Sequence, residues 1–213
     1  MRGLAVPCLL CWLLAPAIAR AQVLVTGETG GSGGQAAVVA ANAIAPKDFG
    51  TLANFWVQYG YGPADHVDVF AAYGNISIFG DTQHYVGAGS NIGLLQRNRH
   101  GVDLSFFNNV SVPFTRRDQA ATVLLTIALV ASHPVALGSV VITPYGGLNA
   151  VVPIGQRARG VFTPLETLRT GIVGVAIPVS KAWSAYAEYD PGPHLQSGGV
   201  GLALTLPRRA ARP

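Results

Sequence analysis

Residues 199–206 have the sequence Gly-Val-Gly-Leu-Ala-Leu-Thr-Leu, in which every second residue is a branched aliphatic one. Val200, Leu202, Leu204 and Leu206 would share one face of an extended strand, because successive side chains of a strand point to opposite faces. The residues between them are small or polar. A period of two therefore predicts a β-strand with two different surroundings.

The same alternation recurs along most of the chain. It is clear at 52–61, 82–94, 102–112 and 183–190. Weaker alternation predicts further strands at 66–77, 121–132, 139–152, 168–178 and 35–45. The sequence thus predicts about ten strands, with about eight or twelve as alternatives.

The composition limits the class of protein. Half of the 213 residues are hydrophobic and only 11% are charged, against about 25% in ordinary soluble domains. The high hydrophobic fraction excludes intrinsic disorder, and 26 glycines disfavour a helix-rich enzyme. A net charge of +4, with no Lys/Arg-rich block interleaved with aromatic residues, excludes a typical nucleic-acid-binding protein.

The second face of the strands decides between a soluble sandwich and a membrane barrel. A sandwich would carry charges there, whereas this face is mostly Gly, Ser, Thr, Asn, Gln and Tyr. Residues 120–142 could be taken for a membrane-spanning helix, but Ser132-His133-Pro134 and Gly138 interrupt them and indicate a hairpin. Strands cross lipid only as a closed barrel. We therefore predict an all-β, antiparallel up-and-down transmembrane β-barrel with a polar, tightly filled lumen.

The first residues have the features of a secretory signal peptide. An apolar run follows a positive start, and Ala19-Arg20-Ala21 provides a cleavage site. The alternative is an uncleaved anchor, for which the run is short. Cys8 and Cys11 both lie in this segment, so the exported chain would have no thiol or disulfide. The predicted organisation is a signal peptide at 1–21, a Gly-rich linker at 22–34, the barrel at 35–206 and a basic tail at 207–213.

The linker contains glycines at a spacing known from dinucleotide-binding enzymes. Thr26-Gly27, Gly31 and Gly33 match the pattern of short-chain dehydrogenases. That family also needs a Tyr-x-x-x-Lys pair. The residue four positions before each of the two lysines, Lys47 and Lys181, is not a tyrosine. No strand–helix alternation follows. We therefore predict no cofactor site here.

Together, these features resemble the bacterial outer-membrane β-barrel proteins of the small single-chain class. The resemblance covers residues 35–206 and rests on the signal peptide, the absence of mature cysteines, the two-residue repeat and the apolar final strand. It implies export to the bacterial outer membrane, contact with its lipid, and folding by the barrel assembly machinery. Such chains often end on an aromatic residue, whereas this strand ends at Leu206 and a basic tail follows.

The resemblance also implies an orientation. An even number of strands leaves both termini in the periplasm and the longer connections outside. The outer connections would be 46–50, 78–81, 113–119, 153–167 and 190–197, and the inner ones 62–65, 95–100, 133–138 and 179–182. Aromatic residues near the strand ends would form an interfacial girdle, consisting of Tyr59, Tyr61, Tyr73, Phe79, Tyr85, Trp183 and Tyr189.

Few residues suggest chemistry. The sequence has no His-Glu-x-x-His motif, and its five histidines are scattered. Asp65-His66-Val67-Asp68 looks like a ligand cluster but is better explained as a turn that leads into a strand. We therefore predict no enzymatic activity, no cofactor and no metal site.

Two groups of charged residues remain as candidate sites. Asp68, Asp103 and Glu188 fall on the minor strand faces and would line the lumen, with Arg169 as a partner. They predict either a narrow cation-preferring pore or a plugged polar network. The second group falls on two predicted outer loops and consists of Arg116, Arg117, Arg157 and Arg159. These arginines would contact anionic lipid headgroups such as lipopolysaccharide; the alternative is that they are ordinary solvated loop residues.

The functional hypotheses follow from the fold. The leading one is a non-enzymatic outer-membrane barrel with a role in envelope structure, small-solute passage or surface interaction. The alternative is a secreted soluble β-barrel that binds a small apolar ligand, which requires large apolar side chains on the inward face. A third, a barrel-embedded or periplasmic enzyme, would need clustered His, Ser or acidic residues at neighbouring strand ends.

Overall fold

A computed structural model describes residues 29–46, 51–78, 81–114, 123–154, 168–192 and 195–206. Almost all of these residues are in strands, and the one short helix is α2 (Arg97–His100). The strands are β1 (Gln35–Pro46), β2 (Leu52–Ala64), β3 (Val67–Ile78), β4 (Asp81–Leu95), β5 (Asp103–Phe114), β6 (Val123–Ser132), β7 (Val135–Leu137), β8 (Val140–Ile154), β9 (Leu168–Pro178), β10 (Trp183–Asp190) and β11 (Leu195–Leu206).

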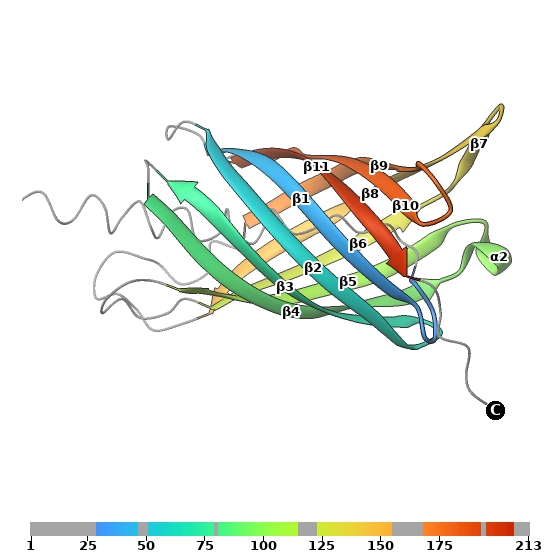
Figure 1. Ribbon diagram of the computed structural model, residues 1–213, viewed down its shortest axis with the longest axis horizontal. Helices are drawn as coiled ribbons and strands as arrows, with labels where there is room; N and C mark the ends of the chain where they lie inside the picture. Colours follow the sequence, from blue (N-terminus) through green and yellow to red (C-terminus); the bar gives the residue numbers. More distant parts are fainter. Residues whose placement is uncertain are drawn as a thin grey trace, which may run out of the picture.

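Within the described residues, ten strands close into one antiparallel barrel (Figure 1). Strands that follow one another in the sequence pair, except that β6 pairs with β8 and not with β7, and β1 pairs with β11 along its whole length. Closure leaves no free edge between the first and last strands, so the backbone groups of both are hydrogen-bonded on two sides. The predicted fold class and strand number are confirmed.

The barrel has two different ends. At the terminal end, where β1 begins at Gln35 and β11 finishes at Leu206, the connections are the turn at 65–66, the α2 segment, the β7 arm and the turn at 179–182. The opposite end, called the distal end here, is where β1 finishes and β2 begins. Both described chain ends are thus at one end of the barrel, as an even number of strands requires.

The described connections are tight because their residues suit the turns. Gly101 ends α2 with a φ of 78°, and Gly138 turns between β7 and β8 with a φ of 64°. Both angles lie in the left-handed region, where glycine meets no steric penalty. In the turn before β10, the Ser180 hydroxyl accepts the Trp183 N–H at 3.1 Å. Such short side-chain bonds stabilise a hairpin turn.

Some boundaries differ from the sequence prediction. Residues 133–138 do not form a simple turn, because β7 pairs with the start of β8 and the two strands extend as an arm beyond the barrel (Figure 1). The last strand begins at Leu195 rather than 199. Its extra residues have no alternation, but they pair with both β10 and β1, and the Ser197 hydroxyl donates to Asp190 Oδ2 at 2.7 Å. Tertiary pairing here overrides a Gly-rich local sequence.

Part of the Gly-rich segment before β1 is also hydrogen-bonded to the barrel. Gly33 N donates to Gly62 O, and Gly62 N donates to Gly34 O, both at 2.8 Å. Residues 29–34 therefore lie against β2 and β3 as a strap, and this name is kept below for those residues. In the described part of the chain, no helix is long and apolar enough to cross a membrane.

Candidate functional site

The outer face of the barrel is a continuous apolar belt. Val200 on β11, Leu148 on β8 and Val173 on β9 are 62%, 71% and 60% exposed. They alternate with buried neighbours, and the same holds around the barrel for Phe55, Val57, Val69, Val86, Val110, Leu129, Ile177 and Leu202. Soluble monomers rarely expose contiguous apolar surface on this scale. A closed barrel with such a belt satisfies the backbone requirements of a lipid-spanning protein.

The chain is a transmembrane β-barrel of the outer-membrane type. This class follows from the combination of closure, an outward apolar belt and an inward face that carries the buried polar residues. The belt also decides against the soluble ligand-binding barrel.

Aromatic residues on the belt agree only in part with the predicted girdle. Tyr61, Trp183 and Tyr189 are exposed near strand ends. Tyr59 and Tyr73 are exposed too, but they stand in the middle of β2 and β3. Tyr85 was assigned wrongly, because it is fully buried in the lumen, as its place on the inward side of the β4 alternation requires. Phe79 lies outside the described residues.

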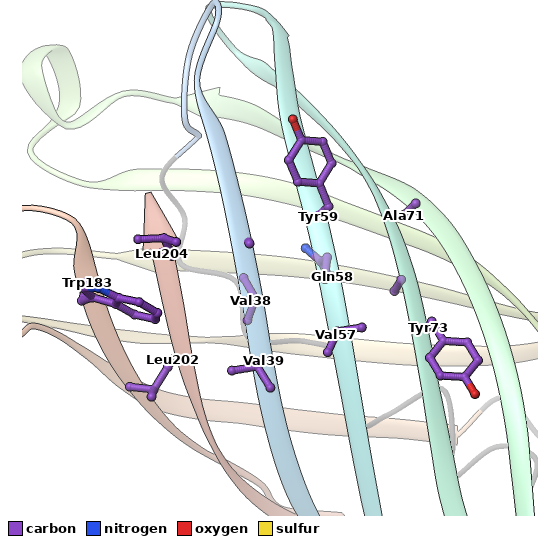
Figure 2. A pocket seen from close by; sticks show the side chains of 12 residues that line it. Val38, Val39, Val57, Gln58, Tyr59, Ala71, Tyr73, Trp183, Leu202 and Leu204 are labelled. Atoms are coloured by element: carbon purple, nitrogen blue, oxygen red, sulfur yellow. The ribbon is translucent and has the colours of Figure 1, made fainter. Parts of the chain in front are cut away.

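A shallow apolar groove of about 510 Å³ lies where the belt carries small side chains. Figure 2 shows it across β11, β1, β2 and β3, with Trp183 on one side and Tyr59 and Tyr73 on the other. The small side chains of Ala37 and Ala71 line the groove. The groove belongs to the outward surface and so faces the hydrocarbon.

The lumen toward the distal end is filled by large side chains. Trp56, Ile76 and Leu124 are fully buried there, together with Ile44, Tyr85 and Val151. Trp56 Nε1 donates to Asn42 Oδ1 at 3.2 Å, so the polar atom of the indole has a partner inside the core. The sequence predicted a polar filling. The lumen is tightly filled as predicted, but large apolar and aromatic side chains share it with buried polar residues such as Asn42, Asn54 and Thr126.

Glycines make room for two of the interior tyrosines. A Cβ placed on Gly74 would collide with the ring of Tyr85, and a Cβ on Gly174 would collide with the ring of Tyr145. Each ring therefore lies across a glycine of the neighbouring strand, an arrangement that covers the exposed glycine backbone. The Tyr85 hydroxyl donates to Asn54 Oδ1 at 3.1 Å.

A second apolar layer closes the half of the lumen nearer the terminal end. The rings of Phe70 and Phe107 stack with centroids 5.2 Å apart and planes 8° from parallel. Val130, Ile172 and Tyr145 pack in the same cluster. Offset aromatic stacking adds to the stability gained from burial. The two layers together leave the middle of the barrel filled by side chains.

The predicted lumen acids have different surroundings. Glu188 on β10 is buried and accepts a hydrogen bond from the Tyr145 hydroxyl at 3.0 Å. Asp103 lies at the terminal rim, where the Arg97 backbone N–H donates to it at 2.8 Å and the Arg97 guanidinium lies 3.7 Å away. Asp68 accepts the Gly30 N–H at 2.8 Å. The structure thus does not bring the three acids together.

The predicted cationic residues are mostly outside the description. Arg169 is opposite Ala150 in the β8–β9 ladder, but its side chain lies outside the described part of the structure. Arg116, Arg117, Arg157 and Arg159 also lie outside the described residues. The pairing of Arg169 with an acid and the contact of the four arginines with lipid headgroups therefore stay predictions.

Sequence reasoning missed several interior partners. Asp190 is two positions after Glu188, so the two side chains share one face of β10, and Asp190 is 1% exposed. The alternation alone could therefore have identified Asp190 as a second acid on the inner face. Arg97 and Tyr145 gave no comparable signal, because Arg97 lies in the α2 connection outside the strand alternation and Tyr145 meets Glu188 43 residues away. Among the described residues, no group of three His, Cys, Asp or Glu could hold a metal ion.

One end of the lumen is not filled. A cavity of about 370 Å³ opens near the terminal end, between the strap and the Phe70 layer. Its wall combines polar side chains, including Gln58, Asp68 and Asn91, with the apolar surfaces of Val38 and Tyr186. This space is called the terminal cavity below.

Comparison with known proteins gives similarities of fold only. No protein-family model matches the sequence, and no curated protein matches it. The β domain of the Bordetella autotransporter BrkA is 13% identical with a TM-score of 0.45, and the match covers 81% of this chain and 99% of that one. The translocator domain of the autotransporter NalP from Neisseria meningitidis is 12% identical with a TM-score of 0.38, covering 88% and 92%. A de novo designed transmembrane β-barrel is 13% identical with a TM-score of 0.38, covering 82% and 97%. None of these similarities assigns a role.

Proposed function

We propose that the protein is a closed, non-conducting outer-membrane barrel with a structural role, which anchors the segments that connect its strands at the distal end. The observation that supports this role is the filled lumen. Trp56, Tyr85 and Phe107 have no exposed surface, and the two apolar clusters to which they belong fill the lumen between its ends. A cation pore would need a continuous water-filled path lined by these acids.

Electrical recording tests this proposal. The refolded protein, inserted in planar bilayers, should give no discrete conductance steps above the lipid background. Trp56→Ala, which removes the largest side chain of the plug, should increase leakage of small ions. Trp183→Ala is the matched control, because it removes the same side chain from the outer face and should leave the bilayer sealed. Stepwise conductance of the unaltered protein would overturn the non-conducting role.

We also propose that the barrel is located in the bacterial outer membrane, after export through a cleaved signal peptide and folding by the barrel assembly machinery. The apolar belt supports a membrane location, and the apolar run before Ala21 supports export. The test is fractionation with gel mobility before and after boiling. Sedimentation with outer membranes and a heat-dependent shift are expected; a soluble periplasmic protein without a shift would contradict the location.

The four arginines at 116, 117, 157 and 159 are proposed to contact phosphate groups of lipopolysaccharide. The bidentate geometry of arginine with phosphate supports this assignment. Replacing all four with glutamine should reduce lipopolysaccharide retained on the purified barrel. Unchanged retention would show that these arginines are ordinary solvated charges.

A further inference from the structure

The β7 arm is an apolar surface that projects from the terminal end of the barrel. Leu137 and Val140 are directly opposite each other in its two strands and are 58% and 47% exposed. Val135 and Ile142 form the next pair on the same face, because opposite residues of an antiparallel ladder point to one side. Residues 133–149 contain no Asp, Glu, Lys or Arg. The arm therefore has no charge that favours its exposure to water, and an exposed apolar surface of this kind indicates an interaction site.

The outer face of the arm adjoins the lipid-facing belt. Val140 and Ile142 lie an even number of residues before Leu148, which is exposed on the belt, so all three point to the same side of β8. In Figure 1 the arm leaves the terminal end and bends away from the barrel axis. A hairpin that bends outward turns its outer face toward the membrane around the barrel. The arm thus presents Leu137 and Val140 to the lipid leaflet at this end.

Basic residues lie on both sides of the arm. The strand order places the arm between the α2 connection, which joins β4 to β5, and the turn at 179–182, which joins β9 to β10. α2 carries Arg97 and Arg99, the turn carries Lys181, and all three are exposed. The Arg97 guanidinium is 3.7 Å from a carboxylate oxygen of Asp103, the first residue of β5. Arg99 and Lys181 add two exposed positive charges beside the apolar arm.

A hydrogen bond joins the base of the arm to the α2 connection. His133 Nδ1 donates to Gly101 O at 2.6 Å. Gly101 is the residue that ends α2. The bond therefore holds the basic α2 segment next to the apolar arm, so that the two move together.

The backbone of the arm restricts the depth at which it can lie. Among the described strands, β7 pairs with β8 alone, so its other edge is not part of a ladder. Backbone groups without partners are too costly for the hydrocarbon core. They are tolerated in the hydrated headgroup region, from which apolar side chains reach about 5–10 Å into the boundary with the acyl chains.

We propose that the arm, α2 and the turn at 179–182 form a surface that binds anionic phospholipids of the leaflet at the terminal end. Leu137 and Val140 enter the boundary between headgroups and acyl chains, while Arg99 and Lys181 bind the lipid phosphates. An apolar face flanked by cations is the composition of segments that lie in a membrane interface, and each cation strengthens the attraction to anionic lipid. This binding goes beyond the structural role proposed above and does not depend on whether the barrel conducts.

Fluorescence quenching by lipids that are brominated on their acyl chains tests where the arm lies. The full chain is refolded into vesicles of phosphatidylcholine and phosphatidylglycerol, and the emission of the unaltered chain is subtracted. Leu137→Trp adds a reporter on the outer face of the arm, and Ala136→Trp adds one on the opposite face of the same strand. We expect Leu137→Trp to be quenched about threefold more strongly. Equal quenching of the two, or quenching of neither, would overturn the proposal.

The same reporter tests the headgroup. Brominating one lipid at a time gives the ratio of quenching by phosphatidylglycerol to quenching by phosphatidylcholine. Leu137→Trp should give a ratio of about five or more, because one basic residue near an anionic surface contributes about fivefold. Phe55→Trp is the matched control, because β2 lies five strands from β8 in either direction around the barrel; its ratio should be close to that of the bulk lipid.

Two substitutions assign the preference to the cations. Adding Arg99→Gln and Lys181→Gln to Leu137→Trp should reduce the ratio to that of Phe55→Trp, and high salt should reduce it in the same direction. A ratio that the two substitutions leave unchanged would overturn the assignment of these residues. Loss of quenching at a high protein-to-lipid ratio would show that a second copy of the chain covers the arm instead. If Leu137→Trp does not refold, Val140→Trp reports on the same face.

Discussion

An arginine placed on the apolar belt should destabilise the protein by an amount that depends on depth in the membrane. Val200 is the sixth of the twelve residues of β11 and is 62% exposed on the outer face. With a rise of about 3.4 Å per residue and a tilt of about 40°, a strand of that length spans about 30 Å, the thickness of the hydrocarbon. Val200 therefore lies near the midplane.

The expected magnitude follows from that position. An arginine on the lipid face costs about 2–4 kcal/mol at the midplane and about 0–1 kcal/mol near the interface. Val200→Arg should therefore lower the free energy of unfolding by about 3 kcal/mol, roughly a 150-fold change in the folding equilibrium at about 1.4 kcal/mol per tenfold.

The control substitution uses the same residue type outside the belt. Val140 is 47% exposed, and it pairs with Leu137 in the arm beyond the barrel. Val140→Arg should cost about 0–1 kcal/mol. Both variants are unfolded with guanidinium chloride in phospholipid vesicles. Their free energies of unfolding are compared with the same value for the dependence on denaturant concentration. If Val200→Arg costs no more than Val140→Arg, the belt does not face lipid and the membrane assignment fails, because exposed substitutions in water change stability by only about 0.5 kcal/mol.

Two further predictions concern the lumen. Gly74→Ala should destabilise the barrel by about 1–3 kcal/mol, because the added Cβ would overlap the ring of Tyr85. The control Gly146→Ala should cost less, because its Cβ would meet one backbone oxygen at 3.3 Å. Equal free energies of unfolding in urea for the two variants would contradict the packing of Tyr85 on Gly74. Tyr145→Phe should cost about 1–3 kcal/mol, because Glu188 loses the donor that it has inside the barrel. Tyr189→Phe, which removes an exposed hydroxyl near the end of β10, should cost less in the same assay, and the reverse order would show that the buried bond contributes little.

The strand pattern could be predicted because it is local. Side chains of adjacent strand residues point to opposite faces whatever the partner strands are, so Trp183 and Val200 could be placed outside and Glu188 inside without a structure. The β7 arm and the start of β11 could not, since their sequences alternate weakly and pairing with neighbouring strands decides them.

The candidate sites were less accessible to sequence reasoning. The inward position of Asp68 followed from alternation, but its partner is the backbone of Gly30, 38 residues away. Glu188 meets Tyr145 across 43 residues. Such contacts depend on the register of all the strands between them, and one residue of slip would change them.

By itself, the sequence determined which residues face lipid, which face inward, and that the strands number about ten, because the pleat of a strand and the chemistry of the bilayer act residue by residue. Only the tertiary structure decided what the inward face does. Closing the sheet brings Trp56, Tyr85 and Phe107 from separate strands into one lumen and fills it. The same closure leaves the terminal cavity beside Asp68, between the strap and the ring of Phe70, because the contacts that bound it come from strands far apart in the sequence.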